Sequence, residues 1–237
     1  MKLLCFAALF LLSFALSAQA PAPVPLKSEP HHHLILENEF VRAFYVEVAP
    51  HDATLLHQHD ADYVFVVLGP GDFVNAVVGK PEVHATLDDA SVRFSRGGFA
   101  HIARTDAGVP FRNITVEFTR PQGALRNLCQ KVTDGAVNNC PDSPSPSMKP
   151  LFETDEIVVS SGALDAKSKH TEAAPHTAAL ILALENSNLD VNVGGDVKAQ
   201  LRSGQVFWLP AGRKHTISSR GGACRFVLVS FKDSAAH

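Results

Sequence analysis

Short runs of residues rich in Val, Phe and Thr recur along this chain, and Gly, Pro, Asp and Asn cluster between them. Within the runs, apolar and polar residues often alternate, as they do in strands that bury one face. No amphipathic helix of ten or more residues stands out after the N-terminal segment. The pattern therefore predicts an all-β protein, built as an antiparallel sandwich or barrel. The expected strands span residues 40–48, 63–68, 73–78, 83–87, 111–118, 157–159, 180–184, 189–193, 206–209 and 226–231.

The two halves of the chain repeat one another in order. Three pairs of segments match at nearly constant separations of 116, 114 and 113 residues. Ordered matches at one separation indicate a duplicated domain of about a hundred residues. The pairs are Glu37-Asn38-Glu39 with Glu153-Thr154-Asp155, Gly98-Phe99-Ala100-His101 with Gly212-Arg213-Lys214-His215, and the strand end at Phe118 with that at Phe231.

The first twenty residues have the pattern of a secretory signal peptide. Lys2 supplies a positive charge, residues 3–16 are apolar, and Ala18-Gln19-Ala20 is a small-x-small cleavage site. We expect cleavage after Ala20, export to the periplasm or the extracellular space, and no membrane segment in the mature protein. The Pro-rich residues 21–33 are expected to be an extended, poorly ordered leader.

Export makes the cysteines informative, because an oxidising compartment permits disulfides. Cys129 and Cys140 flank a short polar loop and are expected to pair, whereas Cys224 precedes an apolar run and is expected to be a buried free thiol. A pairing of Cys224 with one of the loop cysteines stays open. The loop and a Pro/Ser-rich stretch make residues 121–150 the connection between two domains. The domains are expected to span residues 34–120 and 151–232.

Two histidines spaced two residues apart, His57 and His59, come just before an apolar run. On a strand, residues i and i+2 point to the same face, so both imidazoles can be aimed at one point. A third imidazole, His101, follows a Gly-Gly pair whose tight turn can re-aim the next strand. Three converging imidazoles predict a site for a divalent transition metal. We place the run 31–33, which is three histidines, on the surface, because adjacent strand residues face opposite ways and cannot supply three ligands to one site.

Residues 204–215 read Gly, five residues, Pro-x-Gly-x-x-His, and so resemble the second motif of the cupin superfamily, with Ser219 in place of its final Asn. In the first half, His57-x-His59 resembles the first cupin motif, and Gly98-x-x-His101 resembles the end of the second. The resemblance covers nearly all of both expected domains. It implies a bicupin, with two tandem cupin barrels of the double-stranded β-helix, or jelly-roll, type.

The resemblance further implies a mononuclear metal centre in the first domain, with His57, His59 and His101 as ligands. The glutamate ligand of the family is absent, because Tyr63 or Val64 falls at its position and Asp62 is one place early. Tyr63 or Asp62 would then position a substrate or serve as acid or base. The cofactor would be a divalent transition metal, one of Fe, Mn, Ni, Cu and Zn.

The second domain lacks a His-x-His pair. The residues that could form a second metal site there are His170, His176 and His215. His170 and His176 are six residues apart, with Pro175 between them, so strand geometry does not hold them together. We expect this half to be degenerate and to have a structural role.

Two functions of different classes fit these features: an oxygenase acting on a small organic molecule, and a non-catalytic exported protein that binds a small ligand with or without metal. A weaker third function, isomerase or epimerase chemistry on a sugar, would need an acid/base pair that the sequence does not identify. A pocket opening onto the histidines would favour catalysis, and a barrel filled by Phe side chains would favour binding or structure. The formal net charge of −3 gives no sign of nucleic-acid binding. The sequence does not choose between a monomer and a homodimer.

Overall fold

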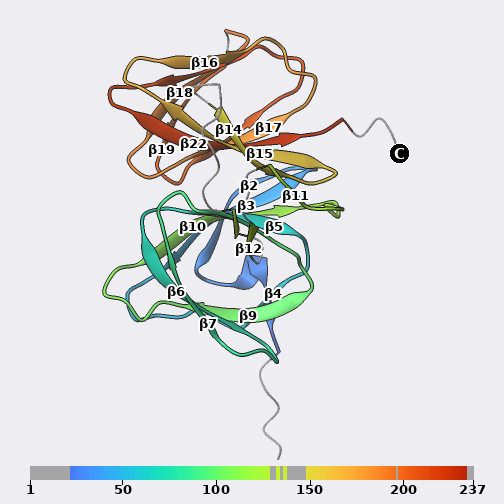
Figure 1. Ribbon diagram of the computed structural model, residues 1–237, viewed down its shortest axis with the longest axis vertical. Helices are drawn as coiled ribbons and strands as arrows, with labels where there is room; N and C mark the ends of the chain where they lie inside the picture. The colour runs from blue at the N-terminus through green and yellow to red at the C-terminus, as the bar shows by residue number, and fades with distance from the viewer. Residues whose placement is uncertain (1–21, 129–131, 134–135, 138–147, 196, 234–237) are drawn as a thin grey trace, which may run out of the picture.

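The structure is a computed structural model that describes residues 22–128, 132–133, 136–137, 148–195 and 197–233. These residues form two β-barrels, one above the other in Figure 1. Their one helical element is a single 3₁₀ turn, η1 (Leu26–Ser28). None of the helical structure described is long and apolar enough to cross a lipid bilayer. The prediction of an all-β fold with two tandem barrels is confirmed.

The first barrel consists of a five-stranded and a seven-stranded sheet. Its strands are β1 (Val24–Pro25), β2 (His32–Glu37), β3 (Val41–Val48), β4 (His57–His59), β5 (Tyr63–Val67), β6 (Gly71–Val77), β7 (Val83–Leu87), β8 (Val92–Ser95), β9 (Phe99–Arg104), β10 (Phe111–Phe118), β12 (Val132–Thr133) and β13 (Ala136–Val137). The smaller sheet has the order β1-β4-β9-β6-β7, and the larger has the order β12-β13-β8-β5-β10-β3-β2.

The second barrel consists of a six-stranded and a four-stranded sheet. Its strands are β11 (Arg126–Asn127), β14 (Met148–Glu153), β15 (Ile157–Leu164), β16 (Lys169–Glu172), β17 (Ala179–Ala183), β18 (Asn188–Val193), β19 (Val197–Arg202), β20 (Val206–Leu209), β21 (His215–Ser219) and β22 (Cys224–Phe231). The larger sheet has the order β11-β14-β15-β22-β17-β20, and the smaller has the order β16-β21-β18-β19. The duplication is visible in the pairing, because β3 with β10 and β15 with β22 are both antiparallel pairs eight residues long.

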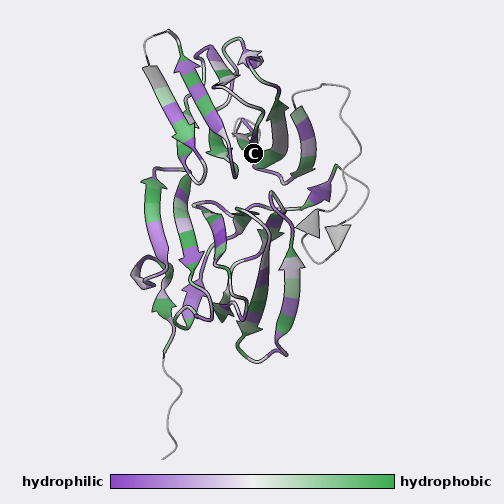
Figure 2. Cartoon of the chain, turned by 90° about the vertical axis from the view of Figure 1, so that its left-hand side faces the viewer, coloured by the Kyte–Doolittle hydropathy of each residue, from purple (hydrophilic) through white to green (hydrophobic). Residues whose placement is uncertain are grey.

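Hydrophobic and hydrophilic residues alternate along many strands of both barrels (Figure 2). Strand β10 is instead buried on both faces, and its two faces have different surroundings. In β10, Asn113 and Thr115 face the interior of the first barrel and line a pocket there. Ile114, Val116 and Phe118 face the other way and belong to a hydrophobic core. The strand therefore connects the pocket directly to the core of the molecule.

That hydrophobic core is shared by the two barrels. It joins residues of the seven-stranded sheet, such as Val116, to residues of the six-stranded sheet, such as Val229. Aromatic rings meet across the boundary: Phe94 lies 6.2 Å from Phe152, between ring centroids, in an edge-to-face arrangement. Burying large apolar side chains is the main favourable contribution to folding. The two barrels therefore support each other and form one packed unit.

The N-terminal segment differs from the expected extended leader, because residues 24–33 are part of the first barrel. Strand β1 pairs in parallel with β4. Leu26 is buried against Phe44 and Val46, and Glu29 is 1% exposed. Proline content led to the wrong prediction: Pro25 lies on the edge strand β1 directly before the 3₁₀ turn, where its missing N–H is tolerated. The connection between the barrels also ends earlier than the expected residue 150, since β14 begins at Met148.

The predictions about the cysteines and the signal peptide are tested only in part. Cys224 is buried and free, and its thiol lies 3.0 Å from the carbonyl oxygen of Asn188, as expected of a buried thiol. The signal peptide over residues 1–20 and the disulfide between Cys129 and Cys140 lie outside the described residues, and both stay predictions.

Candidate metal centre

Three histidines expected to be ligands come together inside the first barrel. His57 and His59 point inward from β4 and are 0% and 2% exposed. Strand β9 pairs with β4 in a register that puts His101 directly opposite His57. The ring centroids of His57 and His101 are 4.4 Å apart, and those of His59 and His101 are 5.1 Å apart. The two-residue spacing thus places His57 and His59 on the same face of the strand, as strand alternation predicts.

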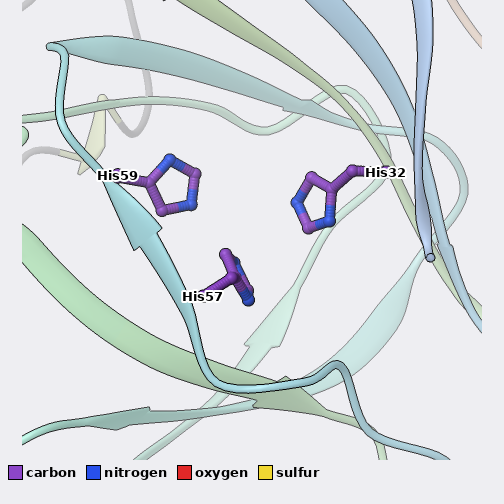
Figure 3. Close-up of side chains that lie close together, drawn as sticks. All are labelled: His32, His57 and His59. Carbon is purple, nitrogen blue, oxygen red and sulfur yellow. The ribbon is translucent and has the colours of Figure 1, made fainter. Parts of the chain in front are cut away.

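A fourth histidine, His32, completes the cluster, and its placement corrects the surface assignment of the run 31–33. Within the described residues, one group of three metal-ligand side chains has all its ligand atoms within 4.8 Å of one another, namely His32, His57 and His59. Figure 3 shows these three rings around a common space. His32 is 8% exposed, whereas its neighbour His33 is exposed. The alternation argument excluded three ligands from this run, but it leaves one, and the middle residue is the one that faces inward.

In His57 and His101 the second ring nitrogen is hydrogen-bonded to an acceptor behind the cluster. The Nδ1 atom of His57 lies 2.8 Å from the carbonyl oxygen of Leu55, and that of His101 lies 2.6 Å from Oδ1 of Asn75. A carbonyl oxygen only accepts, so Nδ1 carries the proton in both rings and Nε2 keeps its lone pair. Both Nε2 atoms are buried and have no hydrogen-bond partner. This is the arrangement in which a histidine binds metal through Nε2.

Two buried carboxylates stand behind the other pair of rings. Nδ1 of His32 lies 2.6 Å from Oε2 of Glu29, and Oε1 of the same carboxylate accepts a hydrogen bond from the Leu55 backbone amide. Nδ1 of His59 lies 3.5 Å from Oε1 of Glu117, a residue of β10 that is 2% exposed. Although burial raises the pKa of Glu29, hydrogen bonds from His32, His31 and Leu55 outweigh it and lower the pKa to about 2. Its carboxylate is therefore ionised and fixes the proton of His32 on Nδ1.

Three of the clustered imidazoles, those of His32, His57 and His101, are neutral at neutral pH. Burial lowers the pKa of His57 to about 4. Burial, together with the neighbouring His57 and His59, lowers the pKa of His101 to about 2. Burial also lowers the pKa of His32. Uncharged nitrogen donors with no carboxylate among them suit a first-row transition metal or zinc better than magnesium or calcium.

These lowered pKa values predict that acid weakens the metal-free protein. Unfolding restores the ordinary pKa of His57, near 6.5, so between pH 6.5 and 4 the unfolded state binds more protons than the folded state. The free energy of unfolding should therefore fall as pH drops through this window, by roughly 3 kcal/mol from His57 alone. Denaturant unfolding in the presence of a chelator at several pH values measures it. The His57→Gln variant should show a flatter profile, and an equal slope in both proteins would contradict the assignment.

Tyr63 lines the pocket beside the cluster, and Asp62 does not. The Tyr63 ring stacks on His59, with ring centroids 4.3 Å apart. Burial raises its pKa to about 12, so its hydroxyl keeps its proton and can donate it in a hydrogen bond. The Asp62 carboxylate instead accepts hydrogen bonds from the Arg96 guanidinium and from the backbone amides of Gly97 and Gln122.

Glu117 is, with Glu29, one of two carboxylates near the cluster that sequence reasoning missed. It lies between His59 and Arg42, whose Nη2 is 3.1 Å from Oε2. The cupin motif places a glutamate shortly after the His-x-His pair, whereas this one comes from strand β10. Strand pairing brings it there, because Glu117 is the register partner of Tyr63. No local spacing in the sequence signals that contact.

The pocket in front of the histidines has a cavity volume of about 40 Å³ and is partly open to solvent. Apart from the four histidines, it is lined by Val46, Val48, Tyr63, Phe65, Phe73, Ala103, Phe111, Asn113 and Thr115. The Phe side chains therefore form walls and leave the interior of the barrel accessible. A concave, mostly apolar site with a few polar groups is typical of small-molecule pockets.

In the second barrel the three predicted ligands do not come together. His215 is 1% exposed, and its Nε2 lies 3.5 Å from Oε2 of Glu172, its register partner on β16. His170 Nε2 lies 3.4 Å from the other oxygen of Glu172. His176 is exposed and no described contact joins it to either histidine. Glu172, which sequence reasoning did not select, thus replaces His176 in this group.

Comparisons with known proteins bear on the fold. The sequence matches no family model and none of the curated proteins. AerE from Microcystis aeruginosa has a TM-score of 0.67 and 13% identity, over 90% of this chain and 98% of that chain. The cupin 2 conserved barrel domain protein from Leptotrichia buccalis has a TM-score of 0.55 and 12% identity, over 85% of this chain and 88% of that one.

A salicylate 1,2-dioxygenase from Pseudaminobacter salicylatoxidans has a TM-score of 0.59 and 12% identity, over 85% of this chain and 76% of that one. That dioxygenase has also been solved as an adduct with gentisate. At these identities a likeness establishes architecture and leaves activity open. Two tandem barrels that match such structures over most of their length show that this chain has the two-barrel cupin fold.

Proposed function

We propose that the first barrel holds one divalent transition metal ion on the Nε2 atoms of His32, His57, His59 and His101. The observation that carries this proposal is the orientation of the rings. Three Nδ1 atoms are hydrogen-bonded to acceptors behind the cluster and the fourth faces a carboxylate, and the Nε2 atoms of His57 and His101 are buried without a hydrogen-bond partner. Buried imidazole nitrogens without partners are costly unless something binds them. A metal ion bound through Nε2 would satisfy them.

We further propose that the site oxidises a small organic molecule with dioxygen. A bound redox-active metal would supply electron transfer between substrate and dioxygen. The protein's own residues would position the substrate and exclude water from it. The apolar walls would exclude water from the substrate, and Tyr63, whose ring stacks on His59, keeps the proton of its hydroxyl. The likeness to a dioxygenase supports this reaction class, as does a pocket that reaches the histidines.

The alternative, a barrel that only binds a small ligand, is less well supported. A binding barrel needs no set of neutral nitrogens turned toward one point. An isomerase or epimerase is disfavoured by the lining of the pocket, since no carboxylate or lysine is among the described residues that line it and could pair with Tyr63 as acid and base.

Elemental analysis of the mature protein, purified without chelator or a metal affinity column, tests the metal centre. We expect close to one transition-metal ion per chain, and its loss in the double variant His57→Ala/His101→Ala. The matched control removes two exposed histidines, His84→Ala/His176→Ala, and should keep the metal. A folded wild-type protein that takes up none of iron, manganese, nickel, copper or zinc would contradict the proposal. Oxygen uptake by the metal-loaded protein with added phenols and carboxylic acids then tests the reaction class.

A further inference from the structure

The pocket in the first barrel has no charged side chain in its wall. Among the described residues that line it, the polar ones are the four histidines, Tyr63, Asn113 and Thr115, and the rest are apolar. No Lys or Arg is there to pair with an anionic group on a ligand. A carboxylate or phosphate buried against such a wall would lose its hydration without a partner. The metal is the one place where an anionic oxygen could be compensated.

Part of the pocket lining is aromatic and apolar. Phe73 and Phe111 stack with ring centroids 4.9 Å apart, and Phe111 belongs to a buried cluster with Val48. Aromatic surfaces of this kind favour contact with planar, polarisable groups. One neutral donor is also present: Thr115 Oγ1 donates to Asn113 Oδ1, which leaves the Asn113 amide nitrogen free of described partners.

Charges behind the histidines reduce the attraction of the site for anions. The carboxylates of Glu29 and Glu117 contact His32 and His59 from the side away from the pocket, and Arg42 is paired with Glu117. Two carboxylates and one guanidinium next to a divalent ion leave a net charge close to +1. Such a centre compensates one anionic oxygen donor and has little left for a second.

We infer that the pocket takes a small, flat, mainly apolar molecule that offers one oxygen donor to the metal and carries no second ionic group. This rests on the metal centre proposed above and names the substrate class of that site. Compounds with one polar end and an uncharged remote end are accepted. Compounds of the same size with an ionic group at each end are rejected, because their remote charge would lie against Phe73 and Phe111.

A pair of size-matched probes tests the inference on the zinc-loaded protein. The probes are p-toluate and terephthalate, which share a ring and one carboxylate and differ at the far end, a methyl group against a second carboxylate. Binding is measured by ligand-observed NMR and by the shift of the visible absorption of cobalt-loaded protein. We expect p-toluate to bind about tenfold or more tightly than terephthalate. Equal or tighter binding of terephthalate, or binding of neither probe, would overturn the inference.

A gain of charge in the wall provides the complementary variant. Phe73 is half-buried at the pocket wall, so Phe73→Arg should remove much of the discrimination by giving the remote carboxylate a partner. Val83→Arg adds the same charge at an exposed site and should leave the ratio unchanged. The control outcome is an equal gain in affinity for terephthalate in the Phe73→Arg and Val83→Arg variants, with metal content and circular dichroism as in the wild type. That result would show that the pocket wall does not set the selectivity.

Failure of the metal centre and failure of the substrate class are distinguishable. If zinc and cobalt are not taken up, the proposed function fails, and the probes become p-xylene and terephthalate on the metal-free protein. The apolar wall still predicts that p-xylene binds and that terephthalate does not. Zinc uptake together with failed discrimination would overturn the substrate class alone.

Discussion

Replacing His32 by glutamine is expected to lower the affinity of the protein for zinc or cobalt about a hundredfold. Four-ligand zinc sites bind with roughly 10–16 kcal/mol, so the loss of one imidazole costs about 3 kcal/mol. His32 is the member of the cluster that comes from outside the cupin motifs, and it is within 4.8 Å of the ligand atoms of His57 and His59. Competition with a chromophoric chelator measures the affinity directly.

The adjacent histidine is the matched control for this prediction. His33 lies on the same strand and faces the opposite way, so His33→Gln should keep the wild-type affinity. Both variants remove one imidazole from β2, and only the loss of the inward-facing imidazole should lower the affinity for metal. If His32→Gln binds cobalt with unchanged affinity and an unchanged visible spectrum, His32 is not a ligand and the site is limited to the histidines of β4 and β9.

Replacing Phe152 by alanine is expected to destabilise both barrels together, by roughly 3–5 kcal/mol. Phe152 is fully buried on β14 and contacts Phe94 of the first barrel across the shared core. The cavity left by the missing ring would be lined by residues of both barrels. Trp208, the single tryptophan, lies on β20 of the second barrel and its ring stacks on Phe40 of the first, whereas bound cobalt would report on the first barrel alone.

Denaturant unfolding of the cobalt-loaded protein, followed by Trp208 fluorescence and by the cobalt absorption, checks this coupling. We expect the two signals to change in one transition, and both midpoints to shift to lower denaturant in Phe152→Ala. Val78→Ala is the control, since Val78 is 62% exposed and its truncation should change stability by less than about 0.5 kcal/mol. A shift in the fluorescence transition with no change in the cobalt transition would show that the barrels fold independently.

Much of the architecture could be predicted from the sequence, because strand and turn signals are local. The run 111–118 was expected to be a strand and is strand β10 at those bounds. The His57-x-His59 spacing fixed two imidazoles on one face, and the Gly-x-x-His segment delivered His101 to the same place. The proline-rich segment before residue 34 was assigned wrongly, since composition does not reveal that a strand such as β4 offers it an open edge.

Alternation along a strand and the duplication of the chain were fixed by the sequence itself, and with them the all-β fold and the ligand pair on β4. Alternation states which residues share a face, but not which face is inside. Only the tertiary structure decided that His32 points inward, that Glu117 backs His59, and that Glu172 joins His215 in the second barrel. Each of these contacts joins strands that are distant along the chain, and their register depends on how the two sheets of each barrel close over a common core.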